Sequence, residues 1–105
     1  MNILCVIPAR AESSRFFEKP LALIKGKPML QWVYGHCREI EAFTDVVVAT
    51  DSDRIKDAAR SFGATVVMTS SRHDTATERL YEVSTKIDAD LYVMVNGDEP
   101  LLTKE

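Results

Sequence analysis

Glycine is scarce in this chain, with only four among 105 residues. No G-x-G-x-x-G follows the first apolar run, "ILCVI" at residues 3–7. In dinucleotide-binding proteins that fingerprint supplies a tight turn and lets the backbone approach a pyrophosphate closely. Its absence argues against a dinucleotide oxidoreductase, and any phosphate bound here needs side chains rather than a glycine cradle.

Cysteines and long apolar runs are also few. Cys5 and Cys37 are the only two cysteines and both fall on apolar faces, so we expect reduced core residues rather than a disulfide. The longest apolar runs are far too short to span a bilayer. The N-terminus opens directly into a predicted strand, without the basic segment of an export signal. We therefore expect a cytoplasmic protein with no membrane partner.

Basic tracts are missing as well. The chain has thirteen Lys and Arg residues and sixteen Asp and Glu residues, which gives a net charge of −3. Nucleic acid is therefore not an expected partner. The apolar content of 46% and the charged content of 28% are those of a globular protein. The length suffices for one domain with one core.

Four apolar runs predict β-strands, at residues 3–7, 46–49, 65–68 and 91–95. They are continuous rather than alternating, which is typical of strands buried on both faces of a parallel sheet. Three helical patterns lie between them, with apolar faces made of Met29, Val33, Cys37 and Ile40, then Ile55, Ala59 and Phe62, then Ala76, Leu80, Val83 and Ile87. This order predicts an α/β fold with an open, doubly wound, mainly parallel sheet in three layers.

Helix-boundary residues support these assignments. They are Pro28 at the first position of the first helix, Asp51 or Ser52 as the cap of the second, Gly63 after its end, and Thr75 with Glu78 as a capping box for the third.

The loop at residues 8–20 concentrates cations at the end of the first strand. Arg10, Arg15 and Lys19 occur there, with Ser13 and Ser14 between them. Guanidinium groups bind phosphate oxygens in pairs, and an ammonium adds a mobile point charge. Ligands of such sheets bind beyond the carboxyl ends of the strands, so we interpret this loop as a triphosphate site.

The next two loops allow more than one interpretation. Asp51 and Asp53 could hold a divalent metal, as in many sugar-nucleotide glycosyltransferases, or could stabilise the start of the following helix. The loop at residues 69–76 begins the stretch "TSSRHDTATER", which is rich in hydroxyls and contains Arg72, His73 and Arg79. A single histidine is weak support for a ligand contact.

The loop at residues 96–101, "NGDEPL", carries the sharpest signal. Asp98 follows an apolar strand, where a carboxylate could hold magnesium against phosphates bound by the first loop. Gly97 lets the backbone come close to a ligand. Together the two loops predict a site for a nucleotide and a metal ion.

Five segments occur in a recognisable order: "IPARAESSRFFEKPL", "GKPMLQWV", "VVVATDSDRI", "VVMTSSRHDTATERL" and "VNGDEPL". Over its whole length the chain resembles the N-terminal part of the 3-deoxy-manno-octulosonate (Kdo) cytidylyltransferases. The resemblance implies a Rossmann-like nucleotidyltransferase fold. It also implies an enzyme of lipopolysaccharide biosynthesis that transfers CMP from CTP to an acidic sugar and releases pyrophosphate.

The resemblance also assigns residues. It implies catalytic roles for Arg10, Lys19 and Asp98, with Asp98 as the ligand of a Mg²⁺ cofactor. The nucleotide-binding positions that it implies are Ala9, Arg10, Ser13, Ser14, Arg15, Lys19, Ser71, Arg72, Thr75, Asn96 and Gly97.

The chain departs from the family pattern at Glu18, Thr75, Ala76 and Asn96, where the family has Gly, Ser, Gly and Gln. The family chain also continues beyond residue 105 with a second metal-binding acid, much of the sugar pocket and a dimer interface. We therefore expect residues 1–105 to be the nucleotide-binding half of a cytidylyltransferase domain, and a homodimer only with the full-length family chain. The alternatives are a nucleotide-binding module without turnover and a sugar-nucleotide glycosyltransferase.

Overall fold

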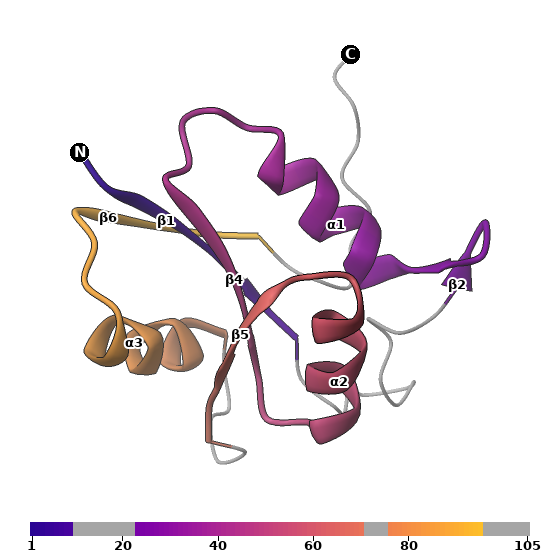
Figure 1. Ribbon diagram of the computed structural model, residues 1–105. Helices are drawn as coiled ribbons and strands as arrows, with labels where there is room; N and C mark the ends of the chain where they lie inside the picture. Colours follow the sequence, from indigo (N-terminus) through magenta and orange to yellow (C-terminus); the bar gives the residue numbers. More distant parts are fainter. Residues whose placement is uncertain (10–22, 71–75, 96–105) are drawn as a thin grey trace.

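The computed structural model describes residues 1–9, 23–70 and 76–95 (Figure 1). Its central sheet has four parallel strands in the order β5-β4-β1-β6. The strands are β1 (Ile3–Pro8), β4 (Asp45–Thr50), β5 (Thr65–Met68) and β6 (Leu91–Met94). The sequence-based strand predictions are confirmed, with ends that differ by no more than one residue.

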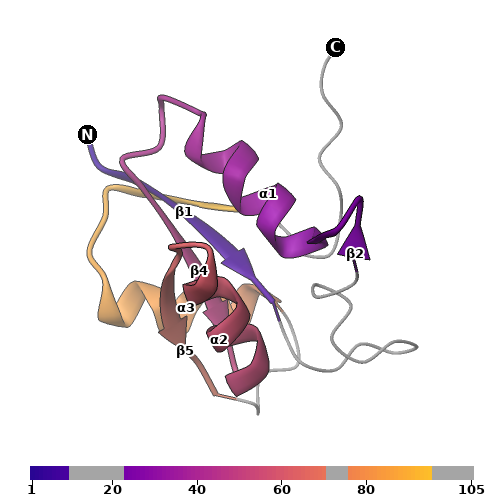
Figure 2. The ribbon, with the colours of Figure 1, turned by 45° about the vertical axis from the view of Figure 1, so that its right-hand side comes forward.

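Helices cover both faces of this sheet, which gives three layers (Figure 2). On one face, Cys5 and Ile7 of β1 pack in a core cluster with α1 (Met29–Arg38) and α2 (Asp53–Ser61). On the other face, the alternate residues Leu4 and Val6 pack with Val83 of α3 (Ala76–Lys86). Successive side chains of a strand point to opposite faces, so a continuous apolar strand packs apolar side chains against the helices on both faces. The doubly wound α/β fold predicted from the sequence is confirmed.

The ends of α2 follow its sequence signals. Ser52 rather than Asp51 is the cap, because its Oγ accepts the Ile55 N–H at 3.2 Å. After the helix, Gly63 adopts φ +86° and its N–H donates to the Arg60 carbonyl. The N–H of Ala64 then donates to the Ala59 carbonyl, which completes a Schellman motif.

Two predictions about α1 are wrong. Pro28 is not its first residue: ψ of 143° is extended, and Pro28 ends the short strand β3 (Lys27–Pro28). Ile40 lies beyond the helix and is 36% exposed. A helix buries positions spaced i, i+3, i+4 and i+7, and the buried face of α1 consists of Leu30, Val33, Tyr34 and Cys37.

A small hairpin before α1 was not predicted. β2 (Leu23–Ile24) pairs antiparallel with β3. The two residues between them, Lys25 and Gly26, have φ of 53° and 84°, as a type I′ turn requires. Trp32 of α1 donates its indole N–H to the Ile24 carbonyl at 2.7 Å. The hairpin is thereby attached to α1.

The start of α3 is described only in part. Thr75 of the predicted capping box lies outside the described residues, and the Ala76 side chain is not described either. In the part of the chain that the structure covers, no helix is long and apolar enough to cross a bilayer.

Candidate nucleotide site at the carboxyl edge of the sheet

The topology of the sheet changes direction beside β1. From β1 the chain moves outward to β4 and β5, and then returns to β6 on the other side of β1. The N–H of Val95, just after β6, donates to the carbonyl of Val6 in β1 at 3.0 Å. The segments that begin at residues 10 and 96 therefore leave from neighbouring strands at one edge. Open α/β sheets bind their ligands at such a point.

Ala9 is the one predicted site residue that falls within the described part of the chain. It is 2% exposed and belongs to the core cluster under α1 and α2. Its N–H donates to the Ala49 carbonyl at 2.9 Å. Ala9 therefore extends the pairing of β1 with β4, and its role toward a nucleotide remains a prediction. The other predicted site residues lie outside the described residues: Arg10, Ser13, Ser14, Arg15, Lys19, Ser71, Arg72, Thr75, Asn96, Gly97 and Asp98.

The end of β4 presents hydroxyls rather than a metal cluster. Thr50 is fully buried, and its Oγ1 accepts the Ser52 N–H at 3.1 Å. Asp53 is exposed in the first turn of α2 and pairs with Lys56 at 3.5 Å. Within the described residues no three His, Cys, Asp or Glu side chains gather to hold a metal. The acids near residues 51–53 are thus better explained as stabilising the start of α2, because the negative charge of Asp53 lies at the positive end of the helix dipole.

The end of β5 is fixed by a buried arginine, Arg79, which the sequence reasoning named with this loop but gave no role. The Thr69 N–H donates to the Thr50 carbonyl at 2.8 Å, which prolongs the pairing of β4 and β5. Arg79 of α3 is 3% exposed, and its Nη1 donates to Thr69 Oγ1 at 2.5 Å and to the Ser70 carbonyl at 3.4 Å. Arg79 lies four residues before Val83, on the apolar face of α3. An arginine at that position of an apolar stripe is the sequence signal for such a contact.

Glu82 completes this connection between α3 and the end of β5. Its Oε1 accepts the Ser70 N–H at 2.9 Å. Its Oε2 pairs with Lys86 at 2.8 Å, and Lys86 also donates to the Met68 carbonyl at 2.8 Å. Three side chains of one helix therefore hold three successive residues, 68–70, at the edge where ligands of this fold bind.

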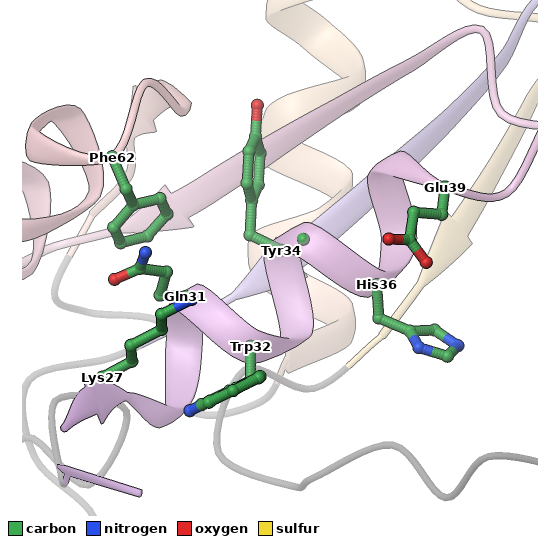
Figure 3. Close-up of a pocket in the computed structure, with 8 residues that line it drawn as sticks. Lys27, Gln31, Trp32, Tyr34, His36, Glu39 and Phe62 are labelled. Atoms are coloured by element: carbon green, nitrogen blue, oxygen red, sulfur yellow. The ribbon is translucent and has the colours of Figure 1, made fainter. Parts of the chain in front are cut away.

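A surface pocket of about 410 Å³ lies elsewhere, along α1 (Figure 3). It runs from Lys27 and Gln31, which lie near Phe62 at the end of α2, to His36 and Glu39. Trp32 lies along it, 4.8 Å from the Lys27 ammonium. Ala9, the one predicted site residue that the structure describes, is not among its described lining residues.

The two cysteines meet in the core. Cys5 of β1 and Cys37 of α1 are both fully buried and free, as the composition predicts. The hydrogen bond between the two thiols, together with burial, raises the pKa of Cys5 well above its usual range. A protonated buried thiol is a poor nucleophile, so Cys5 is a packing residue rather than a catalytic one.

Comparisons with known proteins agree with this arrangement. A family profile described as "Cytidylyltransferase" matches residues 4–105. The chain belongs to this cytidylyltransferase family. The resemblance seen in the five sequence segments is thereby confirmed.

Individual relatives are identical to the chain at about half of the aligned positions. A 3-deoxy-manno-octulosonate cytidylyltransferase of Geobacter metallireducens is 51% identical over 97% of the chain. An 8-amino-3,8-dideoxy-manno-octulosonate cytidylyltransferase of Shewanella piezotolerans is 49% identical over the same share. The chain spans about 40% of the first relative's length and 43% of the second's.

A solved structure gives the same result. A CMP:2-keto-3-deoxy-manno-octonic acid synthetase, solved in complex with CTP, superimposes with a TM-score of 0.94 and 43% sequence identity. The match covers 97% of this chain and 42% of that one.

Proposed function

We propose that the chain is the CTP-binding part of a cytidylyltransferase that transfers CMP to Kdo or a closely similar acidic sugar. The observation that carries this proposal is the close match to the CTP-complexed synthetase over 97% of the chain. The fold supports it, because the neighbouring ends of β1 and β6 lead into the two segments richest in phosphate- and metal-binding side chains. These are the segments with Arg10, Arg15 and Lys19, and with Asp98.

The reaction needs positioning and charge neutralisation more than proton transfer. The anomeric hydroxyl oxygen of the sugar bonds to the α-phosphorus of CTP and loses its proton. The bond from that phosphorus to the bridging oxygen breaks, and pyrophosphate leaves. In this proposal, Arg10, Arg15 and Lys19 hold the triphosphate oxygens while the nucleophile approaches from the opposite side.

Asp98 would hold magnesium in this site. The donor set fits, because Mg²⁺ takes one or two carboxylates together with phosphate oxygens and water. Bound magnesium would add positive charge beside the phosphates. Among the residues that the structure describes, no three potential metal ligands gather. The exposed Asp53 side chain forms an ion pair with Lys56. The glycosyltransferase alternative, which needs Asp51 and Asp53 as metal ligands, loses support because the chain belongs to the cytidylyltransferase family.

Calorimetry with CTP, UTP, ATP and GTP in the presence of magnesium tests the nucleotide assignment. We expect binding of CTP and markedly weaker binding of the purine nucleotides. Pyrophosphate release is then measured with CTP, magnesium and either Kdo or its 8-amino analogue, since relatives carry both names. CTP binding without pyrophosphate release from either sugar would identify a nucleotide-binding module. The absence of CTP binding would refute the proposal.

A further inference from the structure

We propose that Arg79 is a positioning residue for nucleotide binding and acts by fixing Thr69 and Ser70 at the carboxyl edge of the sheet. This inference rests on the proposed function, because it concerns the affinity of the same edge for CTP. Arg79 is not among the residues that the sequence resemblance assigns to the site.

The position of the contact is the first argument. Thr69 and Ser70 follow Met68, the last residue of β5, so they lie where the pairing of β5 with β4 comes to its end. Arg79 Nη1 donates to the Thr69 hydroxyl and to the Ser70 carbonyl. These bonds fix the point at which the chain leaves the sheet, on the side where ligands of this fold bind.

The second argument is that the Ser70 backbone is held from both sides. Arg79 binds its carbonyl, and Glu82, one turn further along α3, accepts its N–H at 2.9 Å. Thr69 is held in the same way, by Thr50 through its N–H and by Arg79 through its hydroxyl. Two successive residues are therefore fixed in both place and orientation.

The third argument concerns cost. Arg79 is 3% exposed on a helix face that packs Val83 into an apolar cluster. A buried charge is expensive to desolvate, and a well-packed apolar side chain at such a position is often neutral or stabilising by comparison. The arginine contributes what an apolar residue could not, namely a donor that reaches both Thr69 and Ser70.

Preorganisation connects this contact to affinity. A binding edge that adopts its competent arrangement only part of the time binds with an affinity reduced by that fraction. If loss of the Arg79 bonds leaves the end of β5 in place one tenth of the time, the dissociation constant for CTP rises about tenfold. Without Arg79, ordering of the end of β5 on CTP binding would cost part of the binding free energy.

The test is calorimetry with CTP and magnesium on four variants and the wild type. Arg79→Met keeps length but removes the donors, and we expect an approximately tenfold weaker affinity. Arg79→Lys keeps one charged donor, so part of the affinity returns. Thr69→Val removes the hydroxyl that Arg79 binds while keeping the shape of the side chain, and it weakens binding in the same direction. Arg38→Met is the matched control, because Arg38 is 55% exposed and pairs with Asp45 at the start of β4, at the opposite edge of the sheet; its affinity stays unchanged.

A second readout separates positioning from general stability. Hydrogen exchange of the Thr69 and Ser70 amides should accelerate in Arg79→Met while the amides of β1 stay protected. If wild type binds CTP and both Arg79→Met and Thr69→Val bind equally well, the inference is overturned and the proposed function stands. If wild type does not bind CTP, the proposed function fails and the inference fails with it. Should Arg79→Met not fold, Thr69→Val alone decides between these outcomes.

Discussion

The backbone N–H of Val95 donates to the carbonyl of Val6 at 3.0 Å, so the chain leaves β6 beside the end of β1. Adjacent strands therefore lead into residues 10–22 and 96–105, although 73 residues (23–95) lie between these two segments in sequence. A cation-rich segment and an acidic segment that start side by side can act on one ligand. This relationship underlies the first two predictions.

Arg10→Ala and Lys19→Ala should each weaken CTP binding at least tenfold and leave the fold intact. Hydrogen bonds to charged groups contribute about 1.5–3 kcal/mol, and 1.4 kcal/mol corresponds to a factor of ten. Calorimetry measures the affinity, and circular dichroism confirms the fold.

Arg38→Ala is the control for this pair. Arg38 ends α1 and faces Asp45 at 4.0 Å, at the start of β4 and therefore at the opposite edge of the sheet. Its removal also takes away one positive charge, but we expect CTP affinity to stay within a factor of two. Equal affinity in wild type, Arg10→Ala and Lys19→Ala would show that the first loop does not bind the triphosphate.

Asp98→Asn should abolish the magnesium-dependent part of CTP affinity. The change keeps size and one acceptor oxygen but removes the charge that retains a strongly hydrated cation. Affinity measured with EDTA should be the same in variant and wild type, because the basic side chains still contact the phosphates. The measurement is a CTP titration with and without magnesium.

Asp53→Asn provides the matched acidic control. Asp53 is exposed and pairs with Lys56 in the first turn of α2. We expect its magnesium dependence to equal that of wild type. If instead Asp53→Asn lost the magnesium effect and Asp98→Asn kept it, the metal would belong to the Asp51–Asp53 pair and the glycosyltransferase alternative would regain support.

Much of the fold could be predicted because its strongest determinants are local. The strands at residues 3–8 and 45–50 contain the continuous apolar runs 3–7 and 46–49, and Ser52 with Gly63 marks both ends of α2. The hairpin before α1 was missed because its strands are two residues each, too short for a hydrophobic period. Only the Lys25–Gly26 turn signalled it.

The candidate site could be predicted only as a set of loops. The carboxyl ends of parallel strands lie at one edge of the sheet whatever the loop sequences are. The order of strands and helices therefore predicts that the site lies at this edge. The buried contact of Arg79 could not be predicted in this way, because a charged residue in a helical pattern is ordinarily assigned to the solvated face. Its burial depends on how α3 packs over β1, β4 and β6, which its position on the apolar stripe is consistent with but does not determine.

Gly35→Ala should raise the free energy of unfolding by about 0.5–1 kcal/mol. Gly35 lies in the middle of α1 on its exposed side, and a Cβ there would meet no atom within 4 Å. Alanine loses less backbone entropy than glycine on forming a helix. Urea denaturation measures the change.

Gly63→Ala should do the opposite and cost about 1 kcal/mol. A Cβ at Gly63 also has open space, but φ is +86°, where an L side chain is strained. Because an added Cβ would meet no nearby atom at either glycine, the difference between the two substitutions measures the effect of backbone conformation. Destabilisation by Gly35→Ala would show that this face of α1 needs a glycine for a close contact with another segment or chain.

The final prediction concerns pH. The pKa of Cys5 is raised in the folded state by the hydrogen bond with Cys37 and by burial. In the unfolded chain a thiol ionises near pH 8.5. The folded state therefore keeps a proton that the unfolded state loses. The stability associated with Cys5 is complete below about pH 8.5. Above that pH it falls by up to about 1.4 kcal/mol per pH unit.

Urea denaturation at pH 7, 8, 9 and 10 measures this slope, and Cys5→Ala serves as the reference. The variant loses packing, so its free energy of unfolding is lower at pH 7 and 8. It also lacks the thiol, so its pH dependence should be flatter above about pH 8.5. Lysines and tyrosines that titrate in the same range contribute to both proteins and cancel in the difference, whereas the pKa of Cys37 shifts with the loss of its hydrogen bond to Cys5 and is included in the comparison. Parallel curves for wild type and Cys5→Ala would show that Cys5 ionises alike in both states, and that the buried thiol pair does not hold its proton.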